Sequence, residues 1–382
     1  MQFSKSAFYI RGIFFLILGL SMTFLMGCMD SKSDEATEVV STKQINSFAF
    51  KESTGAIKTV QIEWEKNKIP IISDTSFTSM STALINIRTK SGYEFSTTLR
   101  KIEPVPPFEY SQPDSLIAIS DIEGNFDVFT KILLGLGTIN EDLSWNYGKN
   151  HLVLVGDFFD RGQEVFNCLW LIYKLELEAA KAGGRVHFIM GNHEQLNLMG
   201  DYQDMHEKYK KISKLIKIPY KEWLSNRSVI GEWLRNKNCM EKIGDHLFVH
   251  GGLHPDMGEM GWSGEEVNQI FRMAMNGSSN DLKTGSQLVT GRNGPLWYRG
   301  MSLQELRQGQ VDTLLSTYDA NRVVVGHTIV DPEKISMLYE GRVINIDLYH
   351  AANLKKGILR VLLITKDGYF EIDDQLNKQL LN

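Results

Sequence analysis

The sequence predicts a large α/β domain over residues 115–370, preceded by a small β-rich module over residues 46–108. In the larger segment, short apolar runs recur about every 30 residues and helix-like stretches separate them, which is the order of elements in α/β proteins. In the smaller segment, apolar and polar residues alternate over short spans, as they do in strands that bury one face. These two patterns define the expected fold class.

Short alternating or apolar runs locate the individual elements. The module is expected to hold strands at Ile57–Ile62, Ala83–Ile87 and Tyr93–Leu99, and the proline-rich run 104–107 makes a stiff connector. The α/β domain is expected to have helices at Phe126–Leu136 and Glu164–Lys181 and strands at Leu116–Ile119, His151–Val155, Arg185–Met190, His246–Val249, Arg322–Val325 and Val343–Ile346. Residues 201–242 are polar and amphipathic and interrupt this order, so we expect a helical insertion there.

The first 28 residues have the pattern of an exported lipoprotein. A basic start precedes a nearly continuous apolar run over residues 13–26, and the ending Leu25-Met26-Gly27-Cys28 resembles a bacterial lipobox. The run is shorter than the ~20 residues that span a bilayer, so a signal peptide over residues 1–27 is favoured over an uncleaved membrane anchor. Cys28 would then carry a lipid and residues 28–45 would form a flexible tether. The expected location is the bacterial cell envelope, outside the cytoplasm, at the periplasmic or cell surface.

Charge and cysteine content exclude several classes of protein. The 382 residues include 41 basic and 46 acidic side chains, a net charge of −5. The chain therefore lacks the positive field that nonspecific binding of nucleic acid needs, and we expect no nucleic-acid partner. Besides Cys28, only Cys168 and Cys239 are present, which allows one disulfide but neither a disulfide framework nor a cysteine-rich zinc site.

Side chains that can bind metals follow five of the predicted strands, each at the carboxyl end of its strand. These strand-end motifs are Asp121-Ile122-Glu123-Gly124, Gly156-Asp157-Phe158-Phe159-Asp160-Arg161-Gly162, Gly191-Asn192-His193-Glu194, His250-Gly251-Gly252 and Gly326-His327-Thr328. Taken singly, each could be an ordinary turn or a hydrogen-bonded core histidine. Because ligand sites of α/β sheets lie at the carboxyl ends of their strands, the five motifs together predict one common site.

The predicted ligand atoms are carboxylate and amide oxygens and imidazole nitrogens, without a thiolate. Such a set suits hard or borderline divalent ions, Mn or Fe first and Mg or Zn as alternatives, and not copper(I) or iron–sulfur clusters. These ligands are too few for two separate sites, so a pair of ions would have to share a bridging carboxylate. Two ions about 3.5–4 Å apart can clamp a phosphoryl displacement and acidify a bound water.

The order of these motifs closely resembles that of the calcineurin-like metallophosphoesterases, and within them the phosphoprotein phosphatase branch. Two further runs are similar to the bacterial Shewanella-like phosphatases: Gly231-Glu232-Trp233-Leu234-Arg235, ahead of the strand that ends at His250, and Gly294-Pro295-Leu296-Trp297-Tyr298-Arg299-Gly300. The resemblance covers residues 115–370, and the residues before 115 lie outside it.

The resemblance implies a four-layer metallophosphoesterase sandwich, in which two mixed β-sheets lie face to face with helices outside. It implies two metal ions, with Asp157 as the bridging ligand. The first ion would be held by Asp121, Glu123 and Asp157, and the second would be completed by Asn192, His250 and His327.

The resemblance also implies the catalytic roles. His193, oriented by Asp160, would be the general acid that protonates the leaving oxygen. Arg161 and Arg299, together with Asn192, would bind the phosphate, a task that suits a guanidinium fork. A metal-bound hydroxide would attack the phosphate ester.

One position departs from the family pattern. The first family motif is Asp-x-His-Gly, whereas this chain has Glu123 in place of the histidine. A carboxylate favours harder ions. It also lowers the net charge of the two-metal site, ions and ligands together, by one unit relative to a site with histidine. We therefore expect a weaker first-metal site than a histidine would give, unless Glu123 points away and leaves the site degenerate.

The predicted function is hydrolysis of phosphate monoesters, with phosphoserine, phosphothreonine or phosphotyrosine in proteins or peptides as the first choice of substrate. Nucleotide polyphosphates are an alternative, because diadenosine tetraphosphatases share the five motifs, and small phosphate esters are another. The non-enzyme alternative is a surface-anchored binding protein with a degenerate site.

Overall fold

The computed structural model describes residues 43–101, 104–277 and 285–381. The predicted signal peptide 1–27, the predicted lipid site Cys28 and all but the last three residues of the predicted tether 28–45 lie outside these described residues. All described residues belong to a single compact unit. Among them, no helix combines the length and the apolar character needed to cross a membrane.

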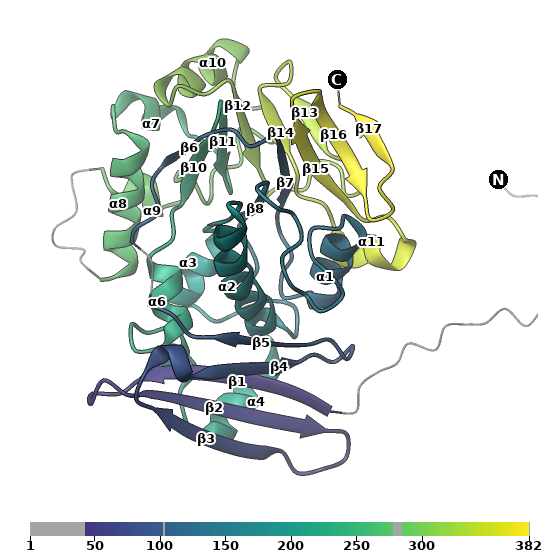
Figure 1. Cartoon of the computed structure of the whole chain (residues 1–382). Helices are drawn as coiled ribbons and strands as arrows, with labels where there is room; N and C mark the ends of the chain where they lie inside the picture. The colour runs from purple at the N-terminus through teal and green to yellow at the C-terminus, as the bar shows by residue number, and fades with distance from the viewer. Residues whose placement is uncertain (1–42, 102–103, 278–284, 382) are drawn as a thin grey trace, which may run out of the picture. The chain divides into compact units, whose positions relative to one another are not determined.

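The first five strands form an antiparallel sheet of their own, in the order β3-β2-β1-β4-β5 (Figure 1). Its elements are β1 (Lys43–Lys51), β2 (Ile57–Glu65), β3 (Ile71–Phe77), η1 (Met80–Thr82), β4 (Leu84–Arg88) and β5 (Glu94–Thr98). The predicted β-rich segment is confirmed, but β1 begins inside the predicted tether, because residues 43–45 pair with residues 63–65 of β2. The edge strand β3 is exposed along most of its length, so it lacks the alternation by which the other strands are predicted.

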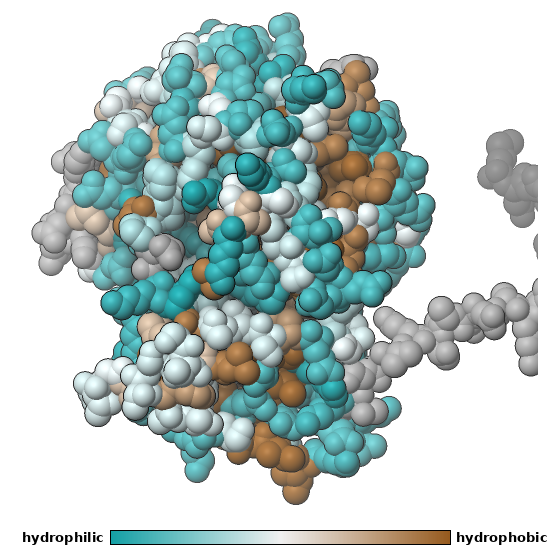
Figure 2. All heavy atoms as spheres, viewed as in Figure 1, coloured by the Kyte–Doolittle hydropathy of each residue, from teal (hydrophilic) through white to brown (hydrophobic). Residues whose placement is uncertain are grey.

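This N-terminal sheet packs on helix α2 (Val165–Ala182). The ring of Phe48 in β1 lies 5.4 Å from that of Phe166, centroid to centroid, and the indole of Trp170 donates to the β1 backbone at 2.9 Å. The outer edge of the sheet is open to solvent: Ile69, just before β3, is 90% exposed, and Figure 2 shows apolar atoms at this end of the molecule.

Two six-stranded mixed sheets form the centre of the larger domain. Their strand orders are β17-β16-β15-β7-β8-β9 and β13-β14-β12-β11-β10-β6. In each sheet three neighbouring strands are parallel, namely β7, β8 and β9 in the first and β11, β12 and β14 in the second. The strand bounds are β6 (Glu109–Tyr110), β7 (Ser115–Ile119), β8 (His151–Val155), β9 (Arg185–Ile189), β10 (Met240–Ile243), β11 (His246–Val249), β12 (Arg322–Val325), β13 (Ser336–Leu338), β14 (Val343–Asn345), β15 (Arg360–Thr365), β16 (Gly368–Asp373) and β17 (Lys378–Leu380).

The two sheets lie face to face and helices cover their outer faces, so the predicted four-layer sandwich is confirmed (Figure 1). The alternation along β7 shows why the layers form. Leu116 belongs to the apolar cluster between the sheets, with Phe248 and Ile344 of the second sheet, whereas Ile117 joins the larger cluster under the helices. The covering helices are α1 (Phe126–Gly135), α2, α7 (Pro255–Glu259), α8 (Gly264–Met275), α9 (Gln287–Thr290), α10 (Gln308–Thr317) and α11 (His350–Lys356).

The stretch 201–242 holds three helices, α4 (Glu207–Ile216), α5 (Tyr220–Trp223) and α6 (Val229–Arg235), after α3 (Asn192–Met199). Of its large aromatic side chains, Tyr209, Tyr220 and Trp223 are buried core residues, whereas Tyr202 is only partly buried. Cys168 and Cys239 are buried free thiols, so the disulfide that the sequence allows does not form between them.

Candidate active site

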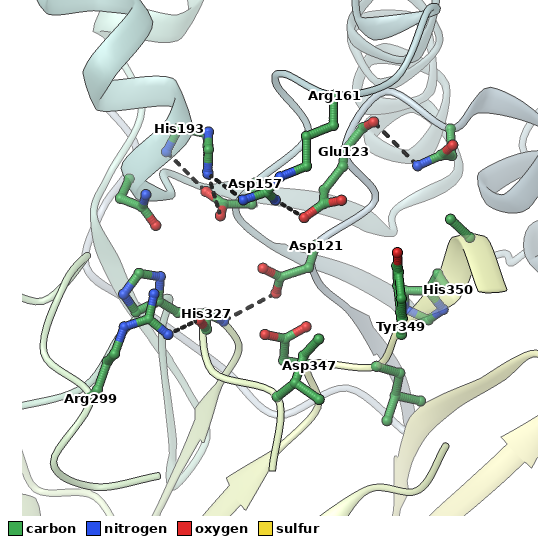
Figure 3. A pocket seen from close by; sticks show the side chains of 15 residues that line it. Asp121, Glu123, Asp157, Arg161, His193, Arg299, His327, Asp347, Tyr349 and His350 are labelled. Atoms are coloured by element: carbon green, nitrogen blue, oxygen red, sulfur yellow. Dashed lines mark hydrogen bonds and ion pairs between the residues drawn. The ribbon is translucent and has the colours of Figure 1, made fainter. Parts of the chain in front are cut away.

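The loops that follow the parallel strands line one cavity of about 390 Å³ (Figure 3). Two residues of the predicted site lie directly behind the cavity wall. Asp160 forms a hydrogen bond with His193, and Nε2 of His250 lies 3.2 Å from Oδ2 of Asp157. All the other residues of the predicted site in the described chain line the cavity, namely Asp121, Glu123, Asp157, Arg161, Asn192, His193, Arg299 and His327. The structure therefore brings the five predicted motifs to one place.

The backbone of these loops is held in an unusual conformation. The residues with left-handed φ are Asp121 (53°), Glu123 (51°), Asp157 (57°), Asp160 (66°), Arg161 (52°) and His327 (64°). Such angles cost about 1–3 kcal/mol each for ordinary side chains and persist where surrounding contacts enforce them. Glu194, which is fully buried, supplies such contacts, because its carboxylate accepts the backbone N–H of Asp157 at 2.9 Å and that of Gly191 at 2.7 Å.

One part of the cavity wall presents ligand atoms suited to a divalent cation. Ligand atoms of Asp157, His250 and His327 lie within 4.8 Å of one another, and Nε2 of His250 is 3.1 Å from Oδ1 of Asn192. Nδ1 of His250 faces the carbonyl of Val155 at 2.7 Å. A carbonyl only accepts, so Nδ1 carries a proton, and Nε2 is the nitrogen that could bind an ion after losing its own proton.

In His327 the other ring nitrogen, Nε2, faces a backbone carbonyl. Its Nε2 faces the carbonyl of Trp297 at 3.1 Å, so this nitrogen carries the proton and Nδ1 is left with a lone pair. Its backbone N–H donates to Asp121 Oδ2 at 3.1 Å, which joins the two sheets at the site. Two imidazole nitrogens beside carboxylate and amide oxygens fit a borderline divalent ion.

The electrostatics of this wall favour a positive charge. Burial alone would lower the pKa of His250, but the carboxylates of Asp157 and Asp121 outweigh it and raise that pKa to about 10. Burial and the charge of His250 lower the pKa of His327 to about 3. Burial raises the pKa of Asp121 to about 6, although His250 opposes the shift. A proton on His250 thus occupies a place where a divalent cation would compete with it.

His193 is oriented by a chain of hydrogen bonds. Its Nδ1 lies 2.7 Å from Asp160 Oδ2, and the amide of Asn197 donates to both Asp160 oxygens at 2.9 and 3.0 Å. The hydroxyl of Tyr220, in the helical insertion, donates to Asn197 Oδ1 at 3.1 Å. The exposed carboxylate of Asp204 lies within 4.8 Å of the ligand atoms of both Asp160 and His193.

These contacts make His193 a stronger base than an ordinary buried histidine. Burial would lower its pKa, but the hydrogen bond to Asp160 and the charge of Asp157 outweigh this and raise it. The charge of Arg161, whose Nη2 lies 3.2 Å from Nε2 of His193, opposes the rise. Arg161 can only donate in this contact, so Nε2 acts as a general acid once it is protonated and faces a substrate oxygen instead.

The two arginines enter the cavity from different sides (Figure 3). Arg299 donates through Nη1 to the carbonyl of His327 at 2.6 Å and to Oγ1 of Thr328 at 3.0 Å, which anchors its guanidinium. Arg161 forms an ion pair with Glu123. The predicted metal ligand Glu123 is therefore turned toward a guanidinium and is not part of the cluster of Asp157, His250 and His327.

Motif reasoning misses three ionisable residues that line the cavity: Asp347, Tyr349 and His350. Asp347 is 5% exposed and follows β14, a strand that the sequence does predict. The signal was the same as for the other five strands, an ionisable residue at the carboxyl end of a predicted strand. Burial, reinforced by the charge of Asp121, raises the pKa of Asp347 well above its usual range.

The fold and this site define a metal-dependent hydrolase. Residues 115–331 match the family model of the calcineurin-like phosphoesterases, and the chain belongs to this family. The match confirms the predicted metallophosphoesterase class, a hydrolase that acts on phosphoric ester bonds, and the metal-binding character of the site.

Particular relatives are protein phosphatases by name. Shewanella-like protein phosphatase 2 of Arabidopsis thaliana is 26% identical over 305 residues, which cover 68% of this chain and 77% of that protein. Shewanella-like protein phosphatase 1 of Plasmodium berghei (strain Anka) is 32% identical over 225 residues, or 56% of this chain and 60% of that protein.

Among solved structures, the cold-active protein-tyrosine phosphatase of a psychrophilic Shewanella species matches with a TM-score of 0.78 and 29% identity. The match covers 88% of this chain and 99% of that one. Residues 115–382 alone cannot supply 88% of this chain, so the similarity extends into the N-terminal sheet. The predicted limit of the resemblance at residue 115 is therefore too narrow, because the motifs that define it all lie after that residue.

Proposed function

We propose that this chain removes phosphate from proteins or peptides, with phosphotyrosine as the preferred substrate and phosphoserine or phosphothreonine as weaker ones. The observation that carries the proposal is the single cavity in which a metal-ligand cluster, an oriented histidine and two arginines meet. Its rim supports phosphotyrosine, since the half-exposed side chains of Ile329 and Tyr349 could pack against a phenyl ring. The protein-tyrosine phosphatase of known structure is consistent with the same substrate.

In the proposed mechanism, two divalent ions, Mn or Fe first and Mg or Zn as alternatives, would polarise the phosphoryl group and acidify water at the site. Asp121 and Asp157 would hold one ion, and the second would be shared by Asp157, Asn192, His250 and His327. Arg161, Arg299 and the amide of Asn192 would hold the phosphate oxygens. His193, kept protonated by Asp160, would give its Nε2 proton to the leaving oxygen.

The test is hydrolysis of p-nitrophenyl phosphate by residues 29–382 from about pH 6 to 9.5, with Mn, Fe, Mg, Zn or EDTA. We expect metal-dependent turnover that EDTA abolishes and that His206→Ala, at a histidine that does not line the cavity, retains. His193→Ala should lower turnover, most strongly with a phosphotyrosine peptide. A phosphotyrosine peptide should then be cleaved faster than phosphoserine peptides or diadenosine tetraphosphate. A folded protein without turnover under any metal would favour the degenerate binding protein instead.

We also propose that the protein is a lipoprotein of the bacterial cell envelope, anchored by Cys28 outside the cytoplasm. The support is the apolar run 13–26 and the Leu25-Met26-Gly27-Cys28 ending. Expression of the full-length chain with radiolabelled palmitate should give a labelled protein in the membrane fraction, and Cys28→Ser should abolish the label. An unlabelled wild-type chain would refute the lipid anchor.

A further inference from the structure

Asp347 is a buried carboxylate that the proposed mechanism leaves without a role. Its backbone N–H bonds to Asn345, but its side chain has no hydrogen bond or ion pair with any described residue. Figure 3 shows it pointing into the cavity, opposite Asp121. Burying an unpaired carboxylate costs several kcal/mol as a rule, so a position of this kind is expected to have a cationic partner.

The strand register places Asp347 beside the metal-ligand cluster. β14 pairs in parallel with β12, and Val325 of β12 is opposite Asn345 of β14. His327 and Asp347 each lie two residues beyond these paired ends, so they emerge side by side from neighbouring strands. β11, on the other side of β12, ends just before His250. Three adjacent parallel strands therefore present an imidazole, an imidazole and a carboxylate to one cavity.

Glu123 is held elsewhere by its own loop. Its side chain pairs with Arg161, while its backbone N–H donates to the carbonyl of Asp157 at 2.9 Å and its carbonyl accepts from Gly162 at 2.9 Å. Backbone and side chain alike thus tie Glu123 to the loop that carries Arg161. This arrangement suits a residue that positions an arginine better than one that binds an ion.

We propose that Asp347, and not Glu123, completes the metal position formed by Asp121 and Asp157, and that Glu123 positions Arg161 for the phosphate. The inference rests on the proposed function, since it assigns ligands within the same two-metal site. It explains how the chain tolerates the loss of the family histidine: a carboxylate from the opposite sheet takes over, and the charge of Glu123 is balanced by Arg161.

The test counts metal ions instead of turnover. Wild type, Asp347→Asn, Glu123→Gln and the control Asp114→Asn, at an exposed aspartate before β7, are loaded with Mn²⁺, desalted and analysed for bound manganese. Titration calorimetry gives the two affinities, and circular dichroism confirms the fold. Asp347→Ser replaces the asparagine variant if that variant does not fold.

We expect two ions in wild type, Asp114→Asn and Glu123→Gln, and at least ~10-fold weaker binding of one ion in Asp347→Asn. Glu123→Gln should instead weaken inhibition by inorganic phosphate. The inference is overturned if the Asp347 variant binds both ions as wild type does, or if Glu123→Gln is the variant that loses an ion. A wild-type protein that binds no Mn²⁺ would refute the proposed two-metal function itself, which is a different result.

Discussion

Two groups of side chains at the cavity differ in how deeply their charges are buried and how firmly they are held. The imidazole half, made of Asp157, Asn192, His250 and His327, is buried, and each of its imidazoles is oriented by a backbone carbonyl. The guanidinium pair, Glu123 and Arg161, has side chains that are 20% and 51% exposed. Water can replace a lost partner in the exposed pair but not in the buried half, so the same loss of charge should have very different costs.

The largest expected effect comes from His250. In metal-free protein at neutral pH, His250→Ala leaves the buried Asp157 without its cation, and we expect a loss of about 3–5 kcal/mol in the free energy of unfolding. Glu123→Gln should cost no more than ~1 kcal/mol, because its partner is half exposed. Urea unfolding in EDTA measures both values.

The pH dependence sharpens this contrast. Because the folded-state pKa of His250 is raised to about 10, its contribution to stability is complete below its unfolded-state pKa and is lost as the pH rises through 10. The gap between wild type and His250→Ala should therefore narrow from pH 6 to pH 10. Two results would contradict the difference between the buried and the exposed group. One is an equal loss of unfolding free energy in His250→Ala and Glu123→Gln at pH 7. The other is a stability difference between wild type and His250→Ala that widens as the pH rises.

Next in size is the effect of His193→Asn on catalysis. A general acid contributes ~10²–10⁴-fold, and it matters most when the leaving oxygen is a poor leaving group. We expect a loss in this range with a phosphotyrosine peptide and a much smaller one with p-nitrophenyl phosphate. Bound manganese should be unchanged. Equal losses with both substrates would mean that His193 does not donate the proton.

Asp160→Asn should change the pH profile more than the rate at low pH. The hydrogen bond to Asp160 is a main cause of the raised pKa of His193, so its weakening lowers that pKa. Because activity requires protonated His193, the alkaline limb of the kcat profile should move to lower pH. Asp114→Asn is the matched control and should leave the profile in place. An unchanged limb in Asp160→Asn would exclude this role.

The sequence predicts the imidazole half well because its residues stand in motifs that keep the family pattern, each directly after a strand with a clear apolar run. It does not predict the guanidinium pair, since Glu123 and Arg161 meet only through the left-handed turns of two separate loops. Asp347 is missed for another reason: it follows a predicted strand as the other residues do, but it stands in no family motif, so alone it has the pattern of an ordinary turn. What identifies it is its parallel neighbour β12, and strand pairing is not visible in one sequence.

The smallest expected effect tests how far the support of His193 extends. Tyr220 lies in the helical insertion and reaches Asp160 only through Asn197, to which it donates at 3.1 Å. Tyr220→Phe removes a single hydrogen bond and leaves Oδ1 of Asn197 buried without that donor. The expected cost in free energy is about 0.5–1.5 kcal/mol. If this cost acts on catalysis through His193, kcat should fall ~2–10-fold. Tyr202→Phe is the control, because the Tyr202 hydroxyl has no hydrogen bond with a described residue. If stability falls but the alkaline limb of the kcat profile stays in place, Tyr220 has only a packing role. If the limb shifts in the same direction as for Asp160→Asn, the hydrogen-bond network that orients His193 includes Tyr220 of the helical insertion.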